Sequence, residues 1–171
     1  LVVGDPSQNV DQGALVSAAH FKKVASAVAS AKRAGGRVLC GGGPAKVNGA
    51  CKDGWFFSPT LVEGLPNDHR FNQEEIFGPV ASLIPFETEE EALRLANGTN
   101  YGLAATLWTK DLKRAHRFAA RLDTGIVWVN CWLLRDLRTP FGGVKQSGLG
   151  REGGHEALRF FSEPKNICIK L

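Results

Sequence analysis

Apolar positions along the chain switch repeatedly between helical and extended spacing. Ser17 is a good N-cap before one apolar stripe, and Thr88 with Glu91 has the spacing of a capping box before another. Gly35 and Gly98 follow these two stripes and are typical helix ends. Together with the apolar period of 3.6 residues, these signals predict helices at 18–34, 89–96, 111–122 and 156–161.

Short apolar runs between these helices predict strands. Most are four to eight residues long and are bounded by Gly, Pro or polar residues. Strands that alternate with helices over short joints indicate parallel pairing and right-handed crossovers. We therefore expect an α/β fold, a layered domain built on a parallel sheet. The predicted strands are 37–40, 55–62, 80–86, 103–108, 126–129 and 166–170.

Composition narrows the class of protein. With 171 residues and 43% apolar content the chain has enough apolar residues for an ordinary core. Its net charge of +4 is modest, and the basic residues are scattered without interleaved aromatics, so we expect no nucleic-acid partner. No window approaches the ~18 apolar residues of a membrane helix, so we expect no membrane partner.

The cysteines indicate the redox compartment, and the absence of methionine concerns whether the chain is part of a longer protein. The four cysteines, Cys40, Cys51, Cys131 and Cys168, form no CxxC pair and no metal-ligand spacing. We expect free thiols in a reducing cytoplasm and no metal site. The chain has no methionine and begins Leu1-Val2-Val3, from which we expect a piece of a longer protein.

Two sequence segments contain recognisable motifs. QEEIFGPV occupies residues 73–80, and PFGGVKQSGLGREGG occupies residues 140–154. Both segments, at this separation, resemble the C-terminal half of the aldehyde dehydrogenase family, which oxidises aldehydes to acids with NAD(P). The resemblance runs from about Gly13 to Leu171. It implies that 1–150 is the C-terminal part of the catalytic domain and that 151–171 is a terminal helix and oligomerisation strand.

The resemblance implies cofactor-binding residues in the first segment and on the first helix. Glu75 would accept hydrogen bonds from the nicotinamide ribose of NAD, and Phe77 would pack beside the nicotinamide ring. Lys23 and His20, one turn apart on the predicted helix, would lie near the cofactor. The alternative is that Glu75, Lys23 and His20 are solvated surface residues and that Phe77 belongs to the core. The chain has no G-x-G-x-x-G phosphate loop, so the adenosine end would bind mostly elsewhere.

Substrate contacts are expected in NCWLLRDLR, residues 130–138, and at Phe141. In the family this segment lines the aldehyde tunnel, which would involve Cys131, Trp132 and Leu133. An Arg in such a tunnel requires an anionic partner, because an unpaired guanidinium out of water is costly. Its planar fork matches a carboxylate. We therefore expect Arg135 to bind a substrate carboxylate, the alternative being an Arg135–Asp136 or Arg138–Asp136 surface ion pair.

The pattern NCW-x-x-RDLR-x-PFGG resembles the 2-aminomuconic and 2-hydroxymuconic semialdehyde dehydrogenase subgroup, whose substrates carry a carboxylate and whose cofactor is NAD. The resemblance implies a nucleophilic Cys and a general-base Glu upstream of Leu1, and therefore a chain that is inactive alone. Cys131 is not expected to be that nucleophile, because its sequence neighbours supply no base. Two other interpretations stay open: an aldehyde dehydrogenase for another aldehyde, such as a betaine or fatty aldehyde, or a truncated non-catalytic module that binds other subunits.

The last apolar run, 166–170, has no obvious partner strand within the chain. Its apolar residues are Ile167, Ile169 and, just beyond, Leu171. In the family this strand joins the sheet of another subunit, and an exposed strand edge left alone favours aggregation. We therefore expect a homo-oligomer that forms through this strand.

Overall fold

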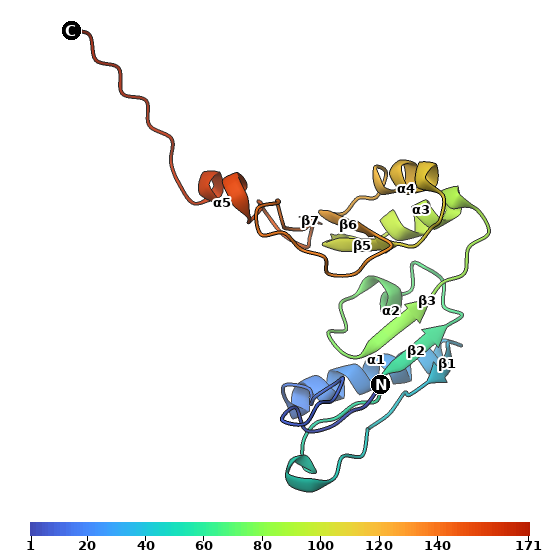
Figure 1. Ribbon diagram of the computed structural model, residues 1–171. Coiled ribbons are helices and arrows are strands. Elements are labelled where there is room, and N and C mark those ends of the chain that lie inside the picture. Colours follow the sequence, from blue (N-terminus) through green and yellow to red (C-terminus); the bar gives the residue numbers. More distant parts are fainter. The chain divides into compact units, whose positions relative to one another are not determined.

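The computed structural model describes residues 1–171 as two units, Leu1–Pro85 and Phe86–Leu171 (Figure 1). The first unit contains helix α1 (Ala18–Arg33), a 3-10 turn (Gly49–Cys51), helix α2 (Arg70–Gln73) and strands β1 (Arg37–Cys40), β2 (Thr60–Glu63) and β3 (Val80–Leu83). The three strands form one sheet in the order β1-β2-β3. The prediction of an α/β arrangement is confirmed for this unit.

Helix α1 begins and ends where the sequence predicts. The Ser17 hydroxyl accepts a hydrogen bond from the His20 amide at 3.2 Å, and Ala34 closes the last turn with its own amide. The apolar face of α1 supplies half of the core of this unit, because Val24, Val28 and Ala31 are almost fully buried. The sheet and its flanking segments supply the other half: Phe57, Val62, Leu65 and Phe71.

The prediction of a purely parallel sheet is wrong for its first strand. β2 and β3 are parallel, with Thr60 opposite Val80, but β1 runs antiparallel to β2, with Arg37 opposite Glu63. A parallel pair needs a crossover connection, usually a helix, that returns the chain to the same end of the sheet. The connection from β1 to β2 contains only the 3-10 turn, so the chain reverses direction instead.

The second unit contains helices α3 (Glu89–Asn97), α4 (Leu112–Ala119) and α5 (Gly154–Phe160). Strands β5 (Ala104–Leu107) and β6 (Ile126–Val129) are parallel and are connected through α4, which is the predicted crossover. A separate antiparallel pair joins β4 (Tyr101–Gly102) to β7 (Val144–Lys145), so the strands do not form one continuous sheet. Gly125 makes this close arrangement possible, because a Cβ there would lie 1.7 Å from the Gly142 carbonyl oxygen.

The predicted C-terminal strand is not a strand in this chain. Residues 162–171 follow α5 in an irregular, exposed course with no strand partner (Figure 1). Ile167, Ile169 and Leu171 are all exposed. Pairing with another subunit therefore stays a prediction. None of the helices combines the length and the apolar character needed to cross a bilayer.

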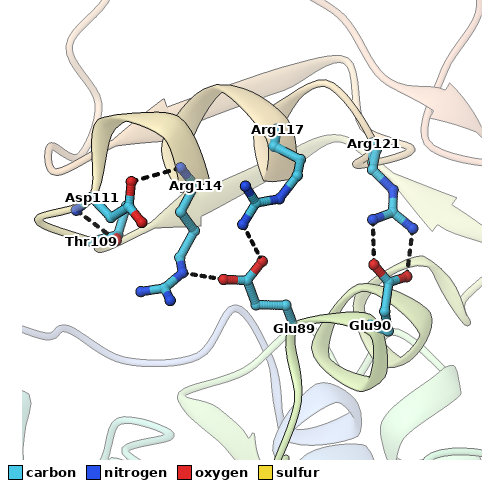
Figure 2. Close-up of polar contacts among 7 residues, drawn as sticks. All are labelled: Glu89, Glu90, Thr109, Asp111, Arg114, Arg117 and Arg121. Atoms are coloured by element: carbon cyan, nitrogen blue, oxygen red, sulfur yellow. Dashed lines mark hydrogen bonds and ion pairs between the residues drawn. The ribbon is translucent and has the colours of Figure 1, made fainter.

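Helices α3 and α4 are joined by ion pairs on their exposed faces. Glu89 accepts hydrogen bonds from Arg114 and, at 2.5 Å, from Arg117 (Figure 2). Glu90 pairs with both terminal nitrogens of Arg121 at 2.6 Å. The hydrogen bonds from Arg117 and Arg114 lower the pKa of Glu89, and the hydrogen bonds from Arg121 lower the pKa of Glu90.

We predict that Val62→Ala destabilises the first unit by about 2 kcal/mol, because two buried methyl groups are lost and a cavity remains. Val62 is fully buried, whereas Val16 is mostly exposed. The same change at Val16 is the matched control and should alter the unfolding free energy by less than about 0.5 kcal/mol. Urea unfolding of both variants measures the difference. Equal midpoints would contradict the assigned core.

We predict that acid destabilises the second unit through Glu89 and Glu90. Their pKa values are lowered in the folded state, so their stabilising contribution is complete above the unfolded value, about 4.3. It is lost as the pH falls through the lower folded values. Thermal unfolding between pH 6 and pH 3 should therefore show a shallower acid decline in the variant Glu89→Gln/Glu90→Gln. The exposed Glu87 makes no ion pair through its side chain, so Glu87→Gln should follow the original protein.

Candidate functional site

The first candidate site is the loop between α2 and β3, which carries Glu75 and Phe77. Both side chains are exposed, and the Phe77 ring is 70% exposed. Phe77 also has a positive φ of 58°, which is uncommon for a non-glycine residue and is strained for a bulky one. The structure therefore does not place Phe77 in the core, which was the alternative interpretation of this residue.

Two residues of α1 hold this loop by its backbone. Lys23 Nζ donates to the Glu75 carbonyl oxygen at 2.9 Å, and His20 Nε2 contacts the Phe77 carbonyl oxygen. The imidazole also lies edge-on to the Phe77 ring, with centroids 5.7 Å apart. The His20 contact requires a proton on Nε2, since the carbonyl can only accept. All four predicted cofactor residues of this unit thus come together.

A glycine permits the close approach of this loop to the helix. A Cβ on Gly78 would lie 2.7 Å from the Val24 side chain, which is fully buried. Any other residue at position 78 would push the loop away from α1. Gly78 of the motif is therefore required by packing, independently of any ligand.

A cavity of about 320 Å³ lies beside the loop, within the first unit. Its wall mixes hydroxyl, cationic and carboxylate groups with the apolar side chains of Ala27, Phe71 and Ile76, a combination typical of small-molecule sites. Most of these residues were not predicted from the sequence, although positions 23, 26, 30 and 33 have the spacing of one helix face. Among the lining residues are Lys23, Ser26, Ser30, Arg33, Arg70 and Glu75.

The second candidate site begins where β6 ends. Asn130 turns the chain with a φ of 55°, and its side-chain amide bonds the Thr109 amide at 2.8 Å and the Thr109 carbonyl at 2.7 Å. Trp132 then packs edge-on against Trp128, with centroids 5.3 Å apart. The Trp128 indole N–H donates to the Leu134 carbonyl at 2.8 Å. The buried Trp128 therefore holds this loop through one ring contact and one hydrogen bond.

The predicted tunnel residues differ in exposure. Cys131 is half-buried, and its thiol is free, as are the other three thiols of the chain. Trp132 and Leu133 are mostly exposed, and Leu133 has a positive φ of 55°. This chain alone does not enclose them as a tunnel, so their substrate contacts stay predictions.

Arg135 lies over the ring of Phe141, with the guanidinium carbon 3.9 Å from the ring centroid. Its Nη2 pairs with the Glu152 carboxylate at 3.2 Å. Glu152 was not predicted as a site residue, because its partner lies 17 residues away and no local pattern signals it. Arg135 and Phe141, both predicted substrate residues, are thus brought into direct contact.

The alternative surface ion pair forms at the other arginine. Arg138 Nε lies 2.9 Å and 3.1 Å from the two Asp136 carboxylate oxygens, and Arg138 Nη2 lies 2.5 Å from one of them. This contact lowers the pKa of Asp136. An Arg138–Asp136 ion pair is therefore present and an Arg135–Asp136 pair is not, and the substrate role of Arg135 stays a prediction.

Comparison with known proteins identifies the family of the chain. The family model described as the aldehyde dehydrogenase family matches residues 1–167. The chain is 48% identical over 171 residues to 2-aminomuconic semialdehyde dehydrogenase of Mus musculus, covering 99% of this chain and 35% of the relative. It is 49% identical over 172 residues to 2-hydroxymuconic semialdehyde dehydrogenase of Pseudomonas sp. (strain CF600), covering 100% of this chain and 35% of the relative.

Solved structures show the same fold. The HpcC protein from Thermus thermophilus superposes with a TM-score of 0.88 at 43% identity, covering 99% of this chain and 35% of that one. Betaine aldehyde dehydrogenase from Staphylococcus aureus, solved in complex with NAD+, gives a TM-score of 0.85 at 38% identity, covering 94% of this chain and 32% of that one. The chain thus spans about a third of the length of the relatives it matches. It belongs to the aldehyde dehydrogenase family.

Proposed function

We propose that this chain is the part of an NAD-dependent aldehyde dehydrogenase that positions cofactor and substrate. The substrate would be a semialdehyde that carries a carboxylate, of the 2-aminomuconate or 2-hydroxymuconate type. Positioning two reactants is a major component of catalysis, because it replaces an encounter in solution by a preformed geometry. The similarity to dehydrogenases named for these two semialdehydes supports the substrate class.

The observation that carries this proposal is the arrangement of Arg135. Its guanidinium lies over the ring of Phe141, and a single N–H reaches Glu152. Arg has five N–H donors in a planar fork, so donors remain for a carboxylate. A hydrogen bond to a charged group contributes about 1.5 to 3 kcal/mol, or roughly 10- to 100-fold in affinity.

The first site fits the nicotinamide half of NAD. Glu75 presents an exposed carboxylate, which is the acceptor that two neighbouring ribose hydroxyls need, and Phe77 presents an exposed aromatic face. His20 and Lys23 hold the backbone of both residues. NAD, when bound, would supply the hydride acceptor for aldehyde oxidation. The protein's part is to hold the ribose and to orient the ring.

We place the nucleophilic Cys and the general-base Glu in the portion of the relatives' length that this chain does not cover. Cys131 is a poor candidate for the nucleophile, because its thiol has no hydrogen-bonding base beside it.

We further propose a cytoplasmic homo-oligomer. Four free thiols support a reducing compartment. The exposed Ile167, Ile169 and Leu171 support pairing of the C-terminal segment with another copy.

A second substrate class can be tested in the same way, because betaine aldehyde dehydrogenase shares this fold. A quaternary ammonium group would be repelled by the charge of Arg135, whereas an aromatic surface without a cation would attract it. Arg135 on Phe141 therefore favours an anionic substrate over a cationic one. A panel of acid, neutral and cationic aldehydes would separate these classes.

We predict that Glu75→Ala raises the KM for NAD by roughly 10- to 100-fold in the complete enzyme that contains this chain, because charged hydrogen bonds to the ribose are lost. Glu74→Ala is the matched control. Its carboxylate is already paired with Arg70, at 2.7 Å, and the proposal assigns it no contact with the ribose. Steady-state kinetics with varied NAD measures both. An unchanged KM in Glu75→Ala would mean that Glu75 is only a solvated surface charge.

We predict that Arg135→Ala lowers the preference for a carboxylate-bearing aldehyde over a neutral one by roughly 10- to 100-fold, as the ratio of the two kcat/KM values. Arg138→Ala removes the same charge three residues away, where the partner is Asp136. It should leave the ratio near its original value. If the two variants behave alike, Arg135 is structural and only the general dehydrogenase function survives.

A further inference from the structure

Glu152 is the carboxylate that contacts the proposed substrate-binding arginine. We propose that Glu152 is a positioning residue for Arg135 and thereby sets the preference for carboxylate-bearing aldehydes. The proposal rests on the proposed function, in which Arg135 binds the substrate carboxylate. It assigns Glu152 a role in selectivity that acts through another side chain and requires no contact with the substrate.

The backbone fixes Glu152 relative to Phe141. The Phe141 amide donates to the Glu152 carbonyl at 2.7 Å, and the Glu152 amide donates to the Phe141 carbonyl at 2.8 Å. The two residues thus form an antiparallel bridge. Directly opposed residues of an antiparallel pair project their side chains to the same side. The ring of Phe141 and the carboxylate of Glu152 therefore form one surface with a defined separation.

Arg135 lies on that surface and contacts both parts. The guanidinium carbon is 3.9 Å from the Phe141 ring centroid, and Nη2 is 3.2 Å from a Glu152 oxygen. The ring holds the guanidinium over its face, because the ring quadrupole attracts the cation. The carboxylate limits rotation of the guanidinium, because the N–H must point toward it. Together the two contacts define the direction of the remaining donors.

The exposure of the Arg135–Glu152 pair indicates whether it stabilises the fold or orients Arg135. The side chains of Arg135 and Glu152 are 41% and 58% exposed. Ion pairs at this exposure contribute little to stability, because water competes and ordering two long side chains costs entropy. An orienting effect is different, because a freely rotating Arg must lose rotamer entropy when it binds a carboxylate. Glu152 would lower this loss before the substrate arrives.

The test uses Glu152→Gln in the complete enzyme, which keeps the backbone bridge and removes the charge. Steady-state kinetics with a carboxylate-bearing semialdehyde and with a neutral aldehyde give the ratio of kcat/KM values. We expect the ratio to fall by about 3- to 5-fold, the size of a partly exposed ion pair, chiefly through the KM of the acid aldehyde. Glu156→Gln is the matched control, since Glu156 faces Arg159 on α5. It should not change the ratio.

A double-mutant cycle separates this proposal from the proposed function. In the Arg135→Ala background, Glu152→Gln should change the ratio no further, because its effect passes through Arg135. If Arg135→Ala changes the ratio but Glu152→Gln does not, Glu152 does not position Arg135, and the proposed function stands alone. If Glu152→Gln lowers the KM of the acid aldehyde, Glu152 competes with the substrate, and the positioning role is overturned. If Arg135→Ala leaves the ratio unchanged, both proposals are wrong.

Discussion

The packing of α1 against the β1-β2-β3 sheet is the constraint on which the first site depends. Val24 and Val28 are buried by this packing. It leaves His20 and Lys23 on the flank of the helix, within reach of the loop before β3. Gly78 brings the same loop against Val24. The core therefore determines where Glu75 and Phe77 lie, and two polar contacts from α1 then hold a backbone that has an unfavourable φ at Phe77.

In the second unit the site is positioned by polar contacts and not by a packed core. No large core surrounds the loop after β6, and most of its side chains are exposed. The loop is instead determined by polar contacts at its ends. Asn130 bonds the Thr109 backbone, and the Trp128 indole bonds the Leu134 carbonyl. The bridge between Phe141 and Glu152 then closes the other end. Such a loop depends on a few hydrogen bonds, and its geometry is correspondingly sensitive to single substitutions.

Local features were predictable from the sequence, and long-range ones were not. Ser17 and Thr88, the two predicted caps, each cap a helix through the side chain, and Asp111, predicted as the first residue of its helix, caps that helix as well. These caps depend on residues three positions away, which periodicity and residue type reveal. The antiparallel course of β1 depends on how the chain returns after residue 40, which no local pattern records. The C-terminal run was apolar at alternate positions, but a strand requires a partner that this chain does not supply.

The same distinction separates the two arginines of the RDLR segment. Arg138 binds a carboxylate two residues away, and its Nε and Nη2 contact both oxygens of Asp136. That pair is local, so the sequence alone suggested it. Asp136 pairs with Arg138, and Arg135 reaches Glu152 through one N–H. The two arginines therefore differ in what they leave available: Arg138 is engaged with both oxygens of its local partner, whereas Arg135 makes one side-chain hydrogen bond and keeps donors for an external anion.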